Sequence, residues 1–151
     1  MQNQRARWPG ARLAAAVLLI GASLAPTSAA AHPHVWVNVE TTVQYDKGTI
    51  TGLTHKWSFD DMYTAMAIQG LDANGDGTYS KEEFAELAKV NIESMKEFAY
   101  FTVAKLGGQD LKFKEPEGAW LEHKDGVLSL YFTMPFDQPV MADAEGLTFA
   151  V

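Results

Sequence analysis

Residues 72–83 are the part of the chain whose residue types and spacing best suit a chemical role, and they read D-A-N-G-D-G-T-Y-S-K-E-E. This run matches the calcium loop of an EF-hand at every constrained position. Calcium is a hard cation that takes about six to eight oxygen ligands. The predicted ligands are the side chains of Asp72, Asn74 and Asp76, the backbone carbonyl of Thr78, Ser80 directly or through a water, and both carboxylate oxygens of Glu83.

A second interpretation of the same run is an Asx- and glycine-rich surface turn followed by a helix. Ser80 and Glu83 have the spacing of a capping box, which would start that helix without any metal. This interpretation does not require Asp72, Asn74 and Asp76 together, however, so calcium binding is the stronger prediction. Gly77 stands where the calcium loop turns sharply and where a positive φ is needed.

An EF-hand also requires a helix on each side of its loop, and the flanking sequence predicts both. Apolar residues recur at spacings of three and four over residues 60–71, including Tyr63 and Met66. A longer apolar stripe, beginning at Phe84 and reaching Met95, predicts an exit helix over residues 81–97. Tyr79, within the loop, is expected to pack against the rest of the domain because a lone EF-hand lacks a paired one.

The remaining sequence alternates in the manner of antiparallel strands. Strands are expected over residues 35–45 and 50–59, joined by a three-residue turn at 46–48. Matching their apolar faces predicts the pairs Val35 with Phe59, Val37 with Trp57, and Val39 with His55. Further strands are expected at 101–105, 111–113, 120–123, 127–132 and 147–151, with a loop over 136–146. The fold class is therefore α+β, an antiparallel sheet of hairpins with one inserted EF-hand helix–loop–helix at about 60–97.

Histidines suggest a second metal site. His32 and His34 share one face of an extended segment, and the register above places Asp60 opposite His34. A cluster of His32, His34 and Asp60 would suit zinc, nickel, cobalt or copper better than calcium. His55 is expected to be partly buried with a hydrogen-bond partner, and His123 to be a solvated hairpin residue.

The first 31 residues have the features of a signal peptide. Arg5, Arg7 and Arg12 precede an apolar stretch over residues 13–25, and three alanines at 29–31 offer a cleavage site. Cleavage after Ala31 would free the amine of His32, cleavage after Ala29 would create an Ala-Ala-His copper or nickel motif, and cleavage after Ala30 would do neither. The mature chain, residues 32–151, is expected to be one β-rich domain, periplasmic or secreted, without a transmembrane span.

The composition of the chain limits the classes of molecule that the protein is expected to bind. The chain has 12 basic and 19 acidic residues, and three of the basic ones are leader arginines. The mature part would therefore carry nine lysines and a net charge near −10, a surface that repels nucleic acid and attracts cations. The sequence contains no cysteine and none of the familiar nucleophile, metalloprotease or phosphate-loop motifs. It predicts a protein that is not an enzyme, and it leaves the oligomeric state open.

Four segments resemble an uncharacterised bacterial family: residues 32–37 (HPHVWV), 53–59, 69–77 and 88–98. Members of that family are described as periplasmic components of an ABC-type transport system, and the domain has no assigned function. The resemblance implies a membrane permease or transport component as partner, often of the nickel/cobalt type. It also implies further strands beyond residue 151, so the sequence is expected to be C-terminally truncated.

These features together predict an exported, calcium-binding accessory component of a transport system that handles a transition metal through its N-terminal histidines. Two alternatives remain open. One is a copper enzyme that uses His32 and His34 as a histidine brace, which requires cleavage after Ala31. The other is a calcium-stabilised adhesion or assembly module with no transition metal.

Overall fold

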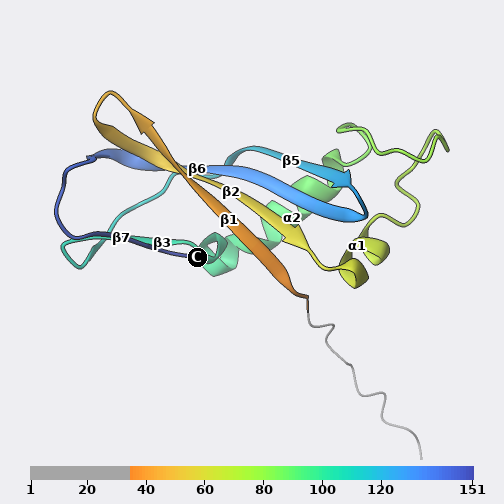
Figure 1. Cartoon of the computed structure of the whole chain (residues 1–151), viewed down its shortest axis with the longest axis horizontal. Helices are drawn as coiled ribbons and strands as arrows, with labels where there is room; N and C mark the ends of the chain where they lie inside the picture. The colour runs from red at the N-terminus through yellow and green to blue at the C-terminus, as the bar shows by residue number, and fades with distance from the viewer. Residues whose placement is uncertain (1–34) are drawn as a thin grey trace, which may run out of the picture. The chain divides into compact units, whose positions relative to one another are not determined.

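The computed structural model describes residues 35–151 (Figure 1). Its larger sheet has four antiparallel strands in the order β1-β2-β6-β5, and its smaller sheet has three in the order β4-β3-β7. Two α-helices and a 3₁₀ segment complete the fold, which confirms the α+β class. The strands are β1 (Val37–Asp46), β2 (Thr49–Phe59), β3 (Val103–Leu106), β4 (Gln109–Asp110), β5 (Glu117–Lys124), β6 (Val127–Met141) and β7 (Leu147–Ala150). The helices are α1 (Asp61–Ala67), α2 (Ala85–Met95) and the 3₁₀ segment η1 (Lys96–Phe101).

The β1–β2 hairpin forms where it was predicted, but its register differs by two residues. Val37 pairs with Phe59 and Val39 with Trp57, so the predicted pairing of Val35 with Phe59 is wrong. The turn holds only Lys47 and Gly48, with φ of 45° and 91°, and the extra residue lies instead in a bulge of β2. A slip of two residues keeps every side chain on its predicted face, because the side-chain period of a strand is two.

The helices are shorter than predicted. Helix α1 ends at Ala67 rather than near Leu71, and the chain then turns through Gly70, whose φ is 75°. Helix α2 begins at Ala85 rather than at Lys81, because residues 81–84 form a turn. Thr64, whose hydroxyl accepts a hydrogen bond from the backbone of Leu128 at 3.2 Å, is the buried residue of α1.

The main core lies between one face of the four-stranded sheet and helix α2. Phe84, at the start of α2, is fully buried and belongs to the same cluster as sheet residues such as Leu128, Leu130 and Phe132. Since α2 packs against β5, the apolar stripe predicted for the exit helix is confirmed at Phe84 and Met95, whereas Val90 is exposed.

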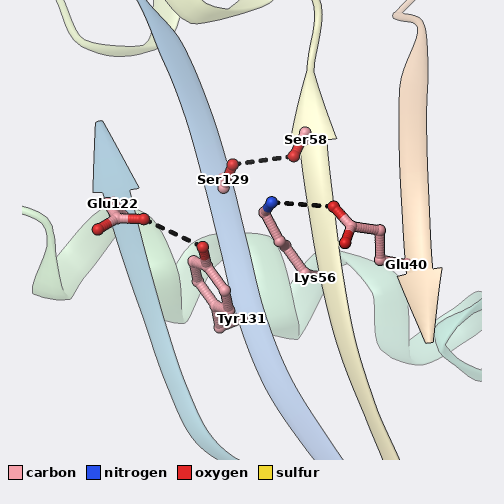
Figure 2. A network of polar contacts seen from close by, with 6 residues as sticks. All are labelled: Glu40, Lys56, Ser58, Glu122, Ser129 and Tyr131. Carbon is pink, nitrogen blue, oxygen red and sulfur yellow. Dashed lines mark hydrogen bonds and ion pairs between the residues drawn. The ribbon is translucent and has the colours of Figure 1, made fainter. Parts of the chain in front are cut away.

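The opposite face of the same sheet is polar. Figure 2 shows cross-strand contacts that tie its strands together: Lys56 to Glu40 at 2.9 Å, Ser58 to Ser129 at 3.0 Å, and Tyr131 to Glu122 at 3.0 Å. The sheet is therefore apolar toward α2 and polar on its other side, the alternation typical of an antiparallel sheet with one buried face.

The smaller sheet forms a second apolar cluster around Ile50, Ala104, Phe136 and Val140. The hairpin predicted around Gly107 and Gly108 is present, but its second strand lies at Gln109–Asp110 and not at 111–113, where Phe113 forms only an isolated bridge to Phe136. The last strand is confirmed. The loop predicted over 136–146 is wrong in its first part, because β6 continues to Met141. No helix within residues 35–151 is long and apolar enough to cross a membrane.

Candidate calcium loop

The loop at residues 72–83 connects α1 to α2 and lies at the same end of the sheet as the β5–β6 turn (Figure 1). Its first residue organises the turn. One carboxylate oxygen of Asp72 accepts hydrogen bonds from the backbone N–H of Gly75 at 2.7 Å and of Asp76 at 3.1 Å, and the other accepts from Gly77 at 2.9 Å. Gly77 has φ of 79°, so the left-handed turn expected there is present. The chain thus wraps around the Asp72 carboxylate.

The middle of the loop is held by Asp76. Its Oδ1 accepts from the amide of Thr78 at 2.8 Å and from the Thr78 hydroxyl at 2.7 Å, and its Oδ2 accepts from the Asn74 side-chain amide at 3.0 Å. The hydrogen bonds from Thr78, hydroxyl first, lower the pKa of Asp76 below its ordinary value. The carboxylate is therefore fully ionised at neutral pH, as a calcium ligand must be.

Glu83 closes the loop. Its Oε2 accepts from the backbone N–H of Ser80 at 2.8 Å and from the Ser80 hydroxyl at 2.9 Å, while the Glu83 N–H donates to that hydroxyl at 3.2 Å. This reciprocal pair has the hydrogen bonds of the predicted capping box, but it precedes the turn at residues 81–84 and does not cap α2, which begins at Ala85 without a side-chain cap. The other oxygen, Oε1, accepts from the backbone N–H of Ala73 at 2.9 Å, which joins the two ends of the loop. These hydrogen bonds, those from Ser80 first, lower the pKa of Glu83.

The donor set of the loop fits calcium in its chemistry, because every predicted ligand is an oxygen. Within residues 35–151, however, no three carboxylate or imidazole side chains converge on one point as metal ligands would. Asp72, Asp76 and Glu83 each accept about three of the four hydrogen bonds that an ionised carboxylate can take. Calcium binding would require these side chains to exchange some N–H and O–H donors for the ion.

Aromatic contacts attach the loop to the sheet. The ring of Tyr79 stacks on that of Phe84, with centroids 5.0 Å apart, and meets the edge of His123 at 5.2 Å. Tyr79 therefore packs on the main core, as expected, and His123 is half-buried beside it rather than a solvated turn residue. Sequence reasoning missed a second contact, in which Lys81 Nζ lies 4.1 Å from the ring centroid of Trp120. A change in the loop can therefore reach β5 through two side chains.

The predicted transition-metal cluster is described only in part. His32 and His34 lie outside the described residues. Because of the two-residue difference in register, Asp60 lies opposite Trp36 and not opposite His34: the Asp60 N–H donates to the Trp36 carbonyl at 3.0 Å. The Asp60 carboxylate accepts from the N–H of Tyr63 at 2.8 Å and from that of Trp36 at 2.6 Å, which lowers its pKa and caps α1. Both of its oxygens therefore already have partners.

His55 is fully buried, and it has the hydrogen-bond partners predicted from its position. Its Nδ1 lies 2.9 Å from the Thr41 hydroxyl, and its Nε2 lies 3.3 Å from the Thr102 hydroxyl. The Thr102 hydroxyl donates its proton to the Tyr100 carbonyl at 2.9 Å, so it accepts from Nε2–H, and Nδ1 accepts from Thr41. Burial lowers the pKa of His55. These contacts make it a structural residue that links β1, β2 and the segment before β3.

The geometry therefore defines an antiparallel α+β domain that carries one acidic, internally hydrogen-bonded loop between two helices. The chain belongs to the family described as "Protein of unknown function (DUF1007)", which it matches over residues 16–151. No curated protein and no solved structure matches the chain.

Proposed function

We propose that this protein is an exported, calcium-binding accessory component of a transport system, and that its N-terminal histidines handle a transition metal. Calcium would bind to Asp72, Asn74, Asp76, Thr78, Ser80 and Glu83. The observation that carries this proposal is the closure of the loop by Glu83, whose carboxylate joins Ala73 to Ser80. That contact holds the last predicted ligand near the first residues of the loop.

Calcium would act as a structural clip. Tyr79 belongs to the loop and packs on the main core, so ordering the loop would also order the junction between α2 and the sheet. An extracellular module of this kind typically binds calcium with a dissociation constant of ~10⁻⁴ to 10⁻³ M. Such an affinity suits a protein exposed to external calcium, in agreement with the proposed signal peptide at residues 1–31.

Transition-metal handling is the second half of the proposal. His32 and His34 would supply imidazole ligands for nickel, cobalt, zinc or copper. Asp60 would join them only by giving up a hydrogen bond from Trp36 or Tyr63. The partner would be a membrane permease of the same transport system, and the protein itself would not act as an enzyme.

Isothermal titration tests both halves with the processed, metal-free protein. Calcium is expected to bind to the native protein and to a Glu82→Gln variant, but not to Glu83→Gln. Glu82 is the matched control because it is the adjacent, exposed glutamate. Nickel, copper and zinc are then titrated into the native protein, His34→Ala and His123→Gln, and only His34→Ala is expected to lose a tight site. Calcium binding that survives Glu83→Gln, or transition-metal binding that survives His34→Ala, would contradict the corresponding half.

A further inference from the structure

The outward face of α1 carries two methionines that are one helical turn apart. Thr64 is the buried residue of this helix, whereas Met62 is 73% exposed and Met66 is 52% exposed. Residues four apart on a helix are neighbours, with Cβ atoms about 5–6 Å from each other. Methionine is unbranched and flexible, so both sulfur atoms can reach one point above the helix surface. The pair is therefore able to supply two ligands to a single ion.

Trp36 lies beside the first of these methionines, where the start of β1 meets α1 (Figure 1). Its N–H donates to the Asp60 carboxylate at 2.6 Å, and its carbonyl accepts from the Asp60 N–H at 3.0 Å. These two hydrogen bonds fix the Trp36 backbone to the residue that caps α1. A shallow hollow of about 400 Å³ is lined by Trp36, Asp60, Asp61 and Met62. Trp36 is 79% exposed, so its ring is accessible to an ion held by the methionines.

The hollow carries negative charge, and its remaining ligand atoms are soft. Within residues 35–151, neither Asp60 nor Asp61 forms an ion pair with a lysine. Both oxygens of Asp60 already accept backbone hydrogen bonds, so Asp60 attracts a cation by its charge more readily than it ligates one. Thioethers are soft ligands of the kind that select Cu(I), whereas imidazole suits nickel and zinc. An indole face also attracts a cation that lies within about 6 Å of the ring centroid.

We propose that Met62, Met66 and Trp36 form a binding site for Cu(I). The two sulfur atoms would be the ligands, the indole face would cover the ion, and the neighbouring carboxylates would offset its charge. The biological role of this site rests on the transition-metal half of the proposed function, which it deepens by naming the metal, its oxidation state and a second set of ligands. The site itself needs no histidine ligand, although His34 precedes Trp36 by two residues in the sequence.

The first test uses the processed, metal-free protein, isotopically labelled at the methionine methyl groups, and silver nitrate in a chloride-free buffer. Ag(I) is a soft monovalent ion like Cu(I), and it does not change oxidation state during the titration. Nuclear magnetic resonance is expected to show the methyl signals of Met62 and Met66 shifting together, while the signal of Met141, which is 57% exposed, stays in place. Zinc, which proteins bind through thiolate, imidazole and carboxylate ligands, should move none of the methionine signals.

The affinity for Cu(I) is then measured without oxygen, by competition with a coloured Cu(I) chelator. Met62→Leu and Met66→Leu each leave a single thioether and are expected to abolish the competition. Met141→Leu is the matched control, because Met141 is an exposed methionine of β6 outside the hollow, and it should bind as the native protein does. Trp36→Leu removes the ring and is expected to weaken binding about two- to fivefold, the worth of an exposed cation–π contact. Melting temperatures check that the variants remain folded.

Several outcomes would overturn the proposal. Silver that moves neither Met62 nor Met66, or Cu(I) binding that both leucine variants retain, would reject the site. Equal shifts at Met141 would mean that silver binds any exposed thioether. His34→Ala separates this site from the histidines: it is expected to lose nickel and zinc binding but to keep the silver shifts at Met62 and Met66. If His34→Ala abolished silver binding while Met62→Leu preserved it, the soft ion would belong to the histidines and the present assignment would be wrong.

Discussion

Replacing Glu83 by glutamine should abolish the stabilisation of the protein by calcium while leaving the fold intact. The glutamine keeps the length of the side chain and one carbonyl oxygen, so part of the capping contact with Ser80 can persist. It loses the negative charge and the second strong acceptor, however, and the bidentate closing ligand of the loop requires both. Because Glu83 packs no apolar group into the core, the core itself should not change.

The size of the effect follows from mass action. For a dissociation constant of ~10⁻⁴ to 10⁻³ M, a calcium concentration of about 10 mM exceeds it by about 10- to 100-fold. Binding to the folded state alone then raises the free energy of unfolding by about 1.4–2.7 kcal/mol. For a domain of this size, that corresponds to a rise in the melting temperature of roughly 6–11 °C. In Glu83→Gln, the rise should fall to the small shift that ionic strength alone produces.

Differential scanning calorimetry with and without calcium measures this directly, and magnesium at the same concentration controls for ionic strength. Glu82→Gln should retain the full calcium shift, since it changes the same charge one residue away. The reasoning fails if Glu83→Gln keeps the calcium shift, or if Glu82→Gln loses it as well. It also fails if magnesium stabilises the native protein as much as calcium does, because the shift would then report general screening of an acidic surface.

Three further predictions concern the scaffold. Burial lowers the pKa of His55 below its ordinary 6.5, so the unfolded chain binds more protons near pH 6. Chemical denaturation should show stability falling as the pH drops through this range, and His55→Leu should remove that part of the slope. The substitution leaves the Thr102 hydroxyl bonded to the Tyr100 carbonyl and frees only the hydroxyl of the exposed Thr41, so the lost hydrogen bonds should cost no more than about 1 kcal/mol. Asp60→Ala should lower the melting temperature and speed amide exchange at Trp36, because the carboxylate accepts that N–H and caps α1. Ala99 has φ of 50°, so Ala99→Gly should raise the free energy of unfolding by up to ~1 kcal/mol. As a control, Ala88→Gly, within α2, should lower the free energy of unfolding by about 1 kcal/mol or more. If both substitutions changed the free energy of unfolding in the same direction, the backbone strain assigned to Ala99 would be refuted.

The hairpins could be predicted because their turns have distinctive chemistry. Asp125 and Gly126, both with positive φ, connect Lys124 to Val127 in a two-residue loop, and the sequence signal for such a turn is strong. The exact pairing of β1 with β2 could not be predicted. The apolar alternation repeats every two residues, so it fixes which face is buried but not which of several registers places it there.

The far half of β6 was missed because Pro135 and Pro139 are typical of loops. The structure accommodates the two prolines because the hydrogen-bond partners of β6 change along the strand. Near Pro135, β6 lies so close to β2 that a Cβ atom added to Gly52 would come within 2.6 Å of the Met134 carbonyl oxygen. Beyond that point, the Asp137 N–H donates to the Lys112 carbonyl, and Lys114 donates to that of Pro135. These partners lie far away in the sequence, so the local composition could not reveal them.

The loop at residues 72–83 shows how much of a candidate binding site a sequence motif can predict. The motif identifies oxygen donors at the correct spacing, and the structure places Glu83 across the two ends of the loop. The capping box and the calcium site, which the sequence presents as alternatives, use the same carboxylate. A capping contact that fixes the rotamer of Glu83 also reduces the side-chain entropy that calcium binding would otherwise cost. Each hydrogen bond that must be broken costs binding energy in return.

The balance of these two effects predicts a weak calcium site whose affinity depends on the Ser80–Glu83 contact. Ser80→Ala removes the hydroxyl but not the backbone N–H, so it should weaken calcium binding without abolishing it. An increase in calcium affinity on this substitution would show that the capping contact competes with the ion instead of preparing the site for it.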